Sequence, residues 1–304
     1  MRILIDTDPG VDDALALAVG FSLRLRIAAL TTVHGNTHVT NSTRNAGYIA
    51  RSLRSDWRIY EGASRPLKGK GGVSYAHGAG GLGDLTPLPS QVTAPEPISA
   101  AAFYRLIAEG SEVYALLCLG PTTNIASAIA ANPQLLDRIG KLVIMGGAFA
   151  ERGNVTKYAE FNVHKDPLAL RIVLDQASKR GVDTTIIPAE TCREVVLTAA
   201  DLVGLEQSSL VPNIRSIVEP YLKYYLNRAT DNNYNGAVLY DALVPLYYLR
   251  PDLFTTKPVR VNVVQEGERI GQTVAADDDQ SSVKITTAVD VATARATILQ
   301  ALGT

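Results

Sequence analysis

The sequence is poor in the features that mark several classes of protein. It has two cysteines in 304 residues, Cys118 and Cys192, too few for a disulfide framework. Lysine and arginine (29) nearly balance aspartate and glutamate (30) without any basic run, so we expect no nucleic-acid partner. No apolar run approaches the roughly 18 residues that span a bilayer. Because a strand-like segment follows Met1 directly, leaving no room for a secretory signal, we expect a cytoplasmic protein with no membrane partner.

Strand-like and helix-like segments alternate along the chain. Expected strands cover residues 2–6, 26–33, 58–60, 113–119, 141–145 and 184–187, and expected helices cover 11–21, 41–54, 99–109, 122–131 and 166–177. This order is typical of an α/β protein with a mostly parallel central sheet flanked by helices. With 46% hydrophobic residues and no repeat, low-complexity tract or convincing linker, we expect a single domain over residues 1–304.

Four aspartates stand within the first thirteen residues: Asp6, Asp8, Asp12 and Asp13. They lie between the first expected strand and helix, at the carboxyl end of a strand, where open α/β sheets bind ligands. No lysine or arginine occurs over residues 3–23 to neutralise them. Carboxylates this dense must be offset by raised pKa values or by a bound cation, and oxygen ligands on a rigid turn suit Ca²⁺, or Mg²⁺ with more retained water. A helix cap would explain Asp12 or Asp13 alone, but not all four.

Other residues that could contact a ligand lie at or after the ends of further expected strands. Asn36 and Thr123 come shortly after two of them, and Met145 ends another. Taken alone, Asn36 would be a turn residue and Thr123 part of a capped helix start. Glu160 and Asn162 share a parity, so an extended segment would point both to one side. A carboxylate with amides nearby suits sugar hydroxyls, which donate and accept hydrogen bonds.

The segment from Asp6 to Ala14 (DTDPGVDDA) resembles the N-terminal signature of the inosine-uridine-preferring nucleoside hydrolases. Further matches follow in order: VHGN at 33–36, LGPTTNIA at 119–126, EFN at 160–162 and VLYDALVPLY at 238–247. Together they extend the resemblance over nearly the whole chain. It implies an N-ribosyl hydrolase that cleaves the N-glycosidic bond of ribonucleosides with the help of Ca²⁺, giving free base and ribose in nucleoside salvage or catabolism. The family often forms dimers or tetramers, so we expect a homodimer or homotetramer.

The resemblance also implies roles for individual residues. Ca²⁺ would be held by Asp8, Asp13, the Thr123 carbonyl and Asp241, with Asp8 also the general base that takes a proton from the attacking water. Asp6 is expected to orient this turn from behind. The expected substrate-binding residues are Asp12, Asn36, His77, Met145, Asn154, Glu160, Asn162, Asp241 and Tyr225. In the family pattern Asp12 contacts the ribose 2′-hydroxyl, Asn162 the 3′-hydroxyl, and Asn154 with Glu160 the 5′-hydroxyl.

One position departs from the family pattern. Many members have a histidine before the C-terminal aspartate, proposed as the acid that protonates the leaving base, and this chain has Tyr240 there. A tyrosine with its ordinary pKa of about 10 is a poor general acid at neutral pH, but its ring stacks well on a base. Tyr240 is therefore a catalytic candidate whose way of activating the leaving group is open.

Two segments interrupt the alternation, 62–97 and 227–236. The first is rich in glycine and proline, and a stretch this long without regular structure is usually a lid or binding loop. It lacks the Gly-x4-Gly-Lys-Ser/Thr pattern of a phosphate-binding loop. A solvated connection is the alternative for each, but with the family resemblance we interpret both as rims of an active site. Base preference stays open, since the aromatic candidates Tyr221, Tyr224, Tyr225, Tyr234 and Tyr240 suit purines and pyrimidines alike.

Two other functions fit parts of the sequence. A phosphohydrolase could use Asp6 or Asp8 as nucleophile, although that class expects Thr or Val where Gly10 stands. A non-catalytic nucleoside-binding protein would keep the pocket after Tyr240 replaced the acid. A further acidic cluster, Asp277–Asp279, lies where a hairpin turn would and lacks the ligand spacing of a calcium loop, so we interpret it as a solvated turn.

Overall fold

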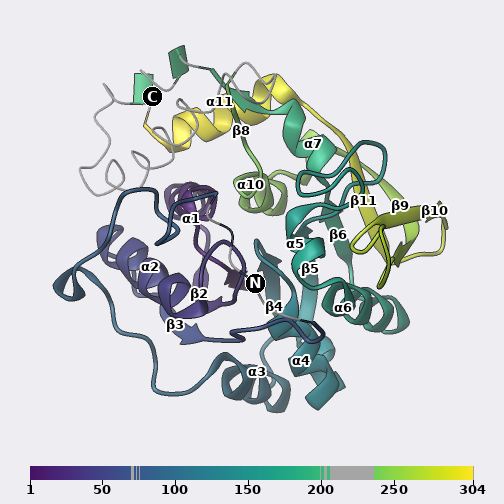
Figure 1. The fold of residues 1–304 in the computed structure, drawn as a ribbon, viewed down its shortest axis with the longest axis horizontal. Coiled ribbons are helices and arrows are strands. Elements are labelled where there is room, and N and C mark those ends of the chain that lie inside the picture. Colours follow the sequence, from purple (N-terminus) through teal and green to yellow (C-terminus); the bar gives the residue numbers. More distant parts are fainter. Residues whose placement is uncertain are drawn as a thin grey trace.

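A nine-stranded sheet runs through the protein (Figure 1). The computed structural model describes residues 1–69, 72, 74, 76–198, 200–201, 204–205 and 236–303. The strands of the sheet are β1 (Arg2–Thr7), β2 (Ile27–Thr32), β3 (Arg58–Glu61), β4 (Tyr114–Cys118), β5 (Ile139–Met145), β6 (Thr184–Ile187), β9 (Phe254–Val263), β10 (Thr273–Asp277) and β11 (Val283–Val289). Their order is β10-β9-β11-β6-β5-β4-β1-β2-β3, and β9 runs in the direction opposite to the other eight strands of this sheet. The expected α/β fold with a mostly parallel sheet is confirmed.

Helices cover both faces of this sheet. They are α1 (Val11–Ser22), α2 (Val39–Ser52), α3 (Ala100–Glu109), α4 (Thr123–Ala131), α5 (Phe161–Lys165), α6 (Pro167–Lys179), α7 (Ala189–Glu194), α10 (Leu243–Leu249) and α11 (Val291–Ala301), with short 3₁₀ turns at Pro89–Gln91, Pro133–Arg138 and Pro251–Leu253. In β1, Ile3 and Ile5 pack into the core beneath α1, α2, α10 and α11, whereas Leu4 packs into the core beneath α3, α4 and α6. Successive strand residues thus serve opposite faces, which explains why residues 3–5 of β1 are all apolar.

The strand order reverses direction beside β1. Strands β2 and β3 extend from one side of it, and β4, β5 and β6 extend from the other. The loops that leave β1 and β4 therefore diverge, which opens a crevice at the carboxyl ends of these strands. The segments that follow β1, β2, β4 and β5 contain Asp8, Asn36, Thr123 and Glu160, so the topology gathers the predicted residues at one edge.

Every expected strand and helix is present, with bounds that differ by one or two residues. The start of α6 shows how local sequence patterns mark the beginning of a helix. Asp166 caps this helix by accepting a hydrogen bond from Ala169 N at 3.1 Å, and Pro167 occupies the first helical position, where no backbone N–H is needed. The short helix α5 and the two-stranded sheet of β7 (Val196–Leu197) and β8 (Ala237–Val238) were not predicted.

The acidic cluster at Asp277–Asp279 does not form a hairpin turn, and that expectation is wrong. Strands β10 and β11 lie on opposite sides of β9, so the connection between them passes the end of β9. Asp277 pairs with Lys257 at 2.7 Å and Asp278 with Arg260 at 3.1 Å. These lysine and arginine contacts, on an exposed edge, give the first two acids ordinary surface partners.

Two findings concern the cysteines and the possibility of a membrane-spanning helix. Cys118 and Cys192 are both buried free thiols, so the described structure contains no disulfide between them. In the described part of the chain, no helix combines the length and apolar character needed to cross a membrane.

Candidate active site

A cavity of about 540 Å³ opens at the carboxyl ends of the parallel strands. A volume in this range suits a small-molecule ligand. Nine predicted site residues line it: Asp12, Asn36, His77, Met145, Asn154, Glu160, Asn162, Tyr240 and Asp241. The long loop at 62–97 contributes Ser74, Ala76 and His77 to the wall, and Gly236 is the described residue of the second predicted rim. The structure thus gathers residues that lie more than 200 positions apart in the sequence.

Three predicted residues of the described chain, Asp8, Asp13 and Thr123, are not among those that line this cavity. Asp8, Asp13 and Thr123 are buried, with exposed fractions of at most 1%. Tyr225 lies outside the described residues, as do the other aromatic candidates Tyr221, Tyr224 and Tyr234. The positions are therefore known for all but one of the predicted residues, while their chemical roles stay predictions.

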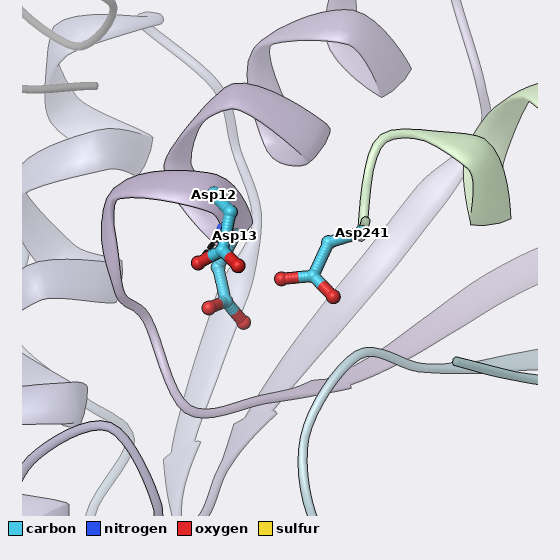
Figure 2. Close-up of side chains that lie close together, drawn as sticks. All are labelled: Asp12, Asp13 and Asp241. Carbon is cyan, nitrogen blue, oxygen red and sulfur yellow. Dashed lines mark hydrogen bonds between the residues drawn. The ribbon is translucent and has the colours of Figure 1, made fainter. Parts of the chain in front are cut away.

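Three carboxylates converge at one side of the cavity. Oxygen atoms of Asp12, Asp13 and Asp241 lie within 4.8 Å of one another, and Figure 2 shows Asp241 reaching across to the first turn of α1. Burial raises the pKa of Asp12 and of Asp13 to about 6. Burial, followed by repulsion from Asp12, Asp13 and Asp8, raises the pKa of Asp241 well above its usual range. A cation among these oxygens would relieve that repulsion, so the donor set fits a metal ion.

Asp8 lies beside this cluster in a narrow slot. Its Oδ2 accepts a hydrogen bond from Asn36 N at 2.6 Å, and its Oδ1 is buried without a hydrogen-bond partner in the described structure. Burial, followed by repulsion from Asp13, raises its pKa. Two glycines make room for the carboxylate, because a Cβ at Gly35 would overlap Oδ2 and a Cβ at Gly120 would overlap Oδ1. One oxygen is therefore held in place, and the other is left without a partner.

Asn36 connects the two buried aspartates of the turn. Besides its backbone contact to Asp8, its side-chain Nδ2 donates to Asp13 Oδ2 at 3.1 Å. Asp13 also accepts from the Thr7 hydroxyl and from Gly10 N, the latter at 2.9 Å. These donors fix the orientation of a carboxylate that faces the cluster, which is the support that a metal ligand requires.

The hydrogen bonds of the Asp6 carboxylate come from Thr31, Tyr104 and Asn124, so its role in orienting the turn stays a prediction. Asp6 is fully buried, and Thr31 Oγ1 and Asn124 Nδ2 donate to its carboxylate at 2.6 and 2.8 Å. Burial raises its pKa to about 7, although the hydrogen bonds from Thr31, Asn124 and Tyr104 lower it. Asn124 also accepts from Ala63 N at 2.8 Å. Asp6 therefore connects β1, β2, α4 and the long loop.

Glu160 and Asn162 reach the cavity from a helix start and not from an extended segment, so the parity argument was wrong. Glu160 caps α5 and accepts from the backbone N–H groups of Asn162 at 2.9 Å, Gly147 at 3.1 Å and Val163 at 3.2 Å. Burial raises its pKa to about 7. Asn162 Nδ2 donates to the Leu119 carbonyl at 2.6 Å, which ties α5 to the end of β4.

His77 belongs to the long loop and closes over the aspartate turn. Its Nδ1 lies 3.3 Å from Asp12 Oδ1, and both side chains are mostly buried. A Cβ at Gly10 would overlap Nδ1, so only glycine allows this approach. Asn154, in contrast, is exposed at the cavity rim, where its Oδ1 accepts from Phe161 N at 2.8 Å.

Two residues near the site had no role in the sequence interpretation. Arg193 of α7 lines the cavity and contacts Glu151 at 3.1 Å and the Arg152 carbonyl at 2.8 Å. Its position just beyond the carboxyl end of β6 is the only signal that could have found it. His34, beside Gly35, is buried, and burial followed by the charge of Lys165 lowers its pKa to about 4.

The family model described as inosine-uridine preferring nucleoside hydrolase matches residues 3–296. The chain belongs to this family. Uridine nucleosidase 1 of Arabidopsis thaliana is 33% identical over 280 residues, which cover 90% of this chain and 81% of that protein. Non-specific ribonucleoside hydrolase RihC of Escherichia coli O9:H4 (strain HS) is 30% identical over 301 residues, covering 96% and 94%.

Solved structures of nucleoside hydrolases share the fold. The plant enzyme PpNRh1 has a TM-score of 0.90 at 26% identity, covering 99% of this chain and 98% of that chain. The purine-preferring ribonucleoside hydrolase from Gardnerella vaginalis has a TM-score of 0.88, also at 26% identity and the same coverage. The family resemblance seen in the sequence is confirmed, and the predicted enzyme class, an N-ribosyl hydrolase, is the class of these relatives.

Proposed function

We propose that this nucleoside hydrolase family member hydrolyses the N-glycosidic bond of ribonucleosides with the help of Ca²⁺, releasing free base and ribose in nucleoside salvage or catabolism. One observation supports the proposal most strongly. The carboxylates of Asp12, Asp13 and Asp241 converge on a cavity whose other wall presents the carboxylate and amides of Glu160, Asn162 and Asn154. A polyhydroxylated sugar is the ligand that such a mixture of donors and acceptors suits.

The proposed Ca²⁺ ligands are Asp8, Asp13, Asp241 and the Thr123 carbonyl. The buried, unpartnered Oδ1 of Asp8 and the mutual repulsion of the acids support this choice. When bound, Ca²⁺ would supply positive charge that favours the ionised carboxylates and lowers the pKa of a coordinated water.

The chain's own residues have distinct proposed roles around the sugar. Asp8 takes a proton from the attacking water at its unpartnered oxygen, as general base. Asp12 and Asp241 accept from the ribose diol, Asn162 contacts the 3′-hydroxyl, and Glu160 with Asn154 holds the 5′-hydroxyl. The anionic groups on this side of the ring stabilise the positive charge that develops at C1′ as the bond to the base breaks.

Base release from inosine, adenosine, guanosine, uridine and cytidine tests the proposal. We expect release that falls by at least about 100-fold after chelation and returns when Ca²⁺ is added, because a bound divalent cation contributes several kcal/mol to such reactions. Mg²⁺ is the matched control ion, since it prefers a smaller octahedral site. A folded, Ca²⁺-loaded protein that binds nucleosides without releasing base would instead support the non-catalytic alternative.

Two substitutions of Tyr240 distinguish stacking on the leaving base from proton donation to it. Its side chain is half-buried and lines the cavity beside Asp241. We expect Tyr240→Phe to keep most of the wild-type kcat, because the ring that stacks on the base is retained. Tyr240→Ala should raise KM about tenfold, since stacking on one base contributes about 1–3 kcal/mol. A loss of kcat above about 100-fold in the phenylalanine variant would assign proton donation to the hydroxyl.

Two further proposals rest on the sequence and the family resemblance alone. They are assembly as a homodimer or homotetramer and a cytoplasmic location. Sedimentation of the purified protein measures the first, and a single monomeric species at micromolar concentration would contradict it.

A further inference from the structure

A hydrogen bond joins the two loops that enclose the Asp8 carboxylate. His34 Nε2 lies 3.0 Å from Thr123 Oγ1, and both residues are buried, at 3% and 1% exposure. His34 directly precedes Gly35, which faces Asp8 Oδ2, and Thr123 follows Gly120, which faces Asp8 Oδ1. The bond therefore joins the loop that contains Gly35 to the segment that contains Gly120, the two glycines that face the Asp8 carboxylate.

The direction of this hydrogen bond follows from the partners of Thr123. Its hydroxyl has one proton, and it donates that proton to Asp166 Oδ2 at 2.7 Å. The hydroxyl oxygen must then accept from His34, so the imidazole has its proton on Nε2. His34 Nδ1 is buried and has no hydrogen-bond partner among the described residues. The three side chains form a directed chain from imidazole to hydroxyl to carboxylate.

Asp166 anchors the far end of this chain. Its Oδ1 caps α6 through Ala169 N at 3.1 Å, and its Oδ2 also accepts from Leu67 N at 2.8 Å. The carboxylate is thus fixed by a helix start and by the long loop that also provides His77. Because one end is anchored so firmly, the chain can hold the turn before α4 at a set distance from the loop after β2.

We propose that His34, Thr123 and Asp166 act as positioning residues that set the width of the Asp8 slot. The inference rests on the proposed function, in which Asp8 is both general base and metal ligand. Among the described residues the Asp8 carboxylate has a hydrogen-bond partner at Oδ2 and none at Oδ1, so the wall at Gly120 limits the rotation of Oδ1. If the turn that contains Gly120 moved away from Asp8, the carboxylate could rotate, which would weaken metal binding and misplace the base.

Paired variants test the hydrogen bond without removing its neighbours. His34→Leu and Thr123→Val delete the polar atoms at nearly constant volume. His34→Gln places an amide N–H close to the Nε2 position, and Thr123→Ser keeps the hydroxyl. Thr122→Val is the matched control, because Thr122 is the adjacent residue, is 4% exposed and has a buried hydroxyl with no hydrogen-bond partner in the described part of the chain.

Each variant is measured for kcat and KM of base release and for the Kd of Ca²⁺ by calorimetry on chelator-treated protein. We expect His34→Leu and Thr123→Val to lower kcat and raise Kd about tenfold, the usual lower range when a residue that orients a ligand is lost. The double variant should be no worse than Thr123→Val alone, because Thr123→Val already removes the contact that His34→Leu removes. His34→Gln and Thr122→Val should stay within about twofold of wild type, and Thr123→Ser should lose less than Thr123→Val because it keeps the hydroxyl.

The melting temperature of each variant in chelator shows whether its losses come from a misplaced Asp8 carboxylate or from a less stable fold. Unchanged kcat and Kd in both His34→Leu and Thr123→Val would overturn the inference while leaving the proposed function intact. Equal losses in Thr122→Val, or losses that only follow melting temperature, would overturn it as well. A wild-type protein that neither binds Ca²⁺ nor releases base would overturn the proposed function and the inference together. Should His34→Leu not fold, His34→Asn replaces it, since its shorter amide stays polar but does not reach Thr123.

Discussion

Asp8→Asn should lower kcat for base release by about 10³-fold or more, while the chelator-treated protein stays at least as stable as wild type. An amide has nearly the shape of a carboxylate but cannot take a proton from water, and loss of a general base costs about 10² to 10⁴ in rate. Loss of a metal ligand adds to this. Burial and repulsion from Asp13 raise the pKa of Asp8, which means that the folded state disfavours its charge. Removing that charge therefore does not destabilise the fold.

Asp279→Asn is the matched control for this substitution. This substitution makes the same chemical change at an exposed residue of the β10–β11 connection. We therefore expect its kcat and melting temperature to match those of wild type. Single-turnover kinetics and thermal melting with and without Ca²⁺ measure the contrast. If Asp8→Asn kept more than a tenth of the wild-type kcat, another group would have to be the base.

The elements of the fold could be predicted wherever the signal is local. The parallel strands β1, β2, β4 and β5 each contain an apolar run of at least three residues, and caps such as Asp166 mark where the helices begin. The antiparallel part could not be predicted in this way. Strands β10 and β11 flank β9, a pairing decided by long-range contacts, so their proximity in sequence suggested a hairpin that does not form.

The candidate site was predictable in composition but not in geometry. Parallel strands bring their carboxyl ends to one edge, so Asp12, Asn36 and Asn162 could be expected near one another before any coordinates existed. The His34–Thr123 hydrogen bond joins residues 89 positions apart, and no local pattern predicts it. Local patterns also do not predict that Gly35 and Gly120 make room for the Asp8 carboxylate. Such a close approach between two loops leaves no periodic pattern in the sequence of either loop.

The second large effect is expected for Gly120→Ala, because Gly120 forms one wall of the Asp8 slot. A Cβ at this position would overlap Asp8 Oδ1. Gly120 is not among the glycines with positive φ, so alanine can adopt its backbone conformation and the strain falls on the carboxylate. We expect kcat to fall about 100-fold, because displacement of a reacting group by about 1 Å has this cost. Overpacking should also lower the free energy of unfolding by about 1–3 kcal/mol.

Gly20→Ala provides the matched control, since both glycines are buried but only one faces a reacting group. A Cβ at Gly20, in α1, would meet its nearest neighbours, the side chains of Ile27, Leu25 and Pro245, at 3.5–3.6 Å, which is ordinary contact. Alanine there should leave kcat unchanged and raise the free energy of unfolding by up to about 1 kcal/mol, because it favours the helix. If Gly120→Ala retained wild-type kcat and Ca²⁺ affinity, the Asp8 carboxylate would tolerate a shift, and catalysis would not depend on the width of the slot. A large loss in Gly120→Ala with a normal Gly20→Ala would mean that the glycine is required by the position of one carboxylate oxygen, and not by the backbone.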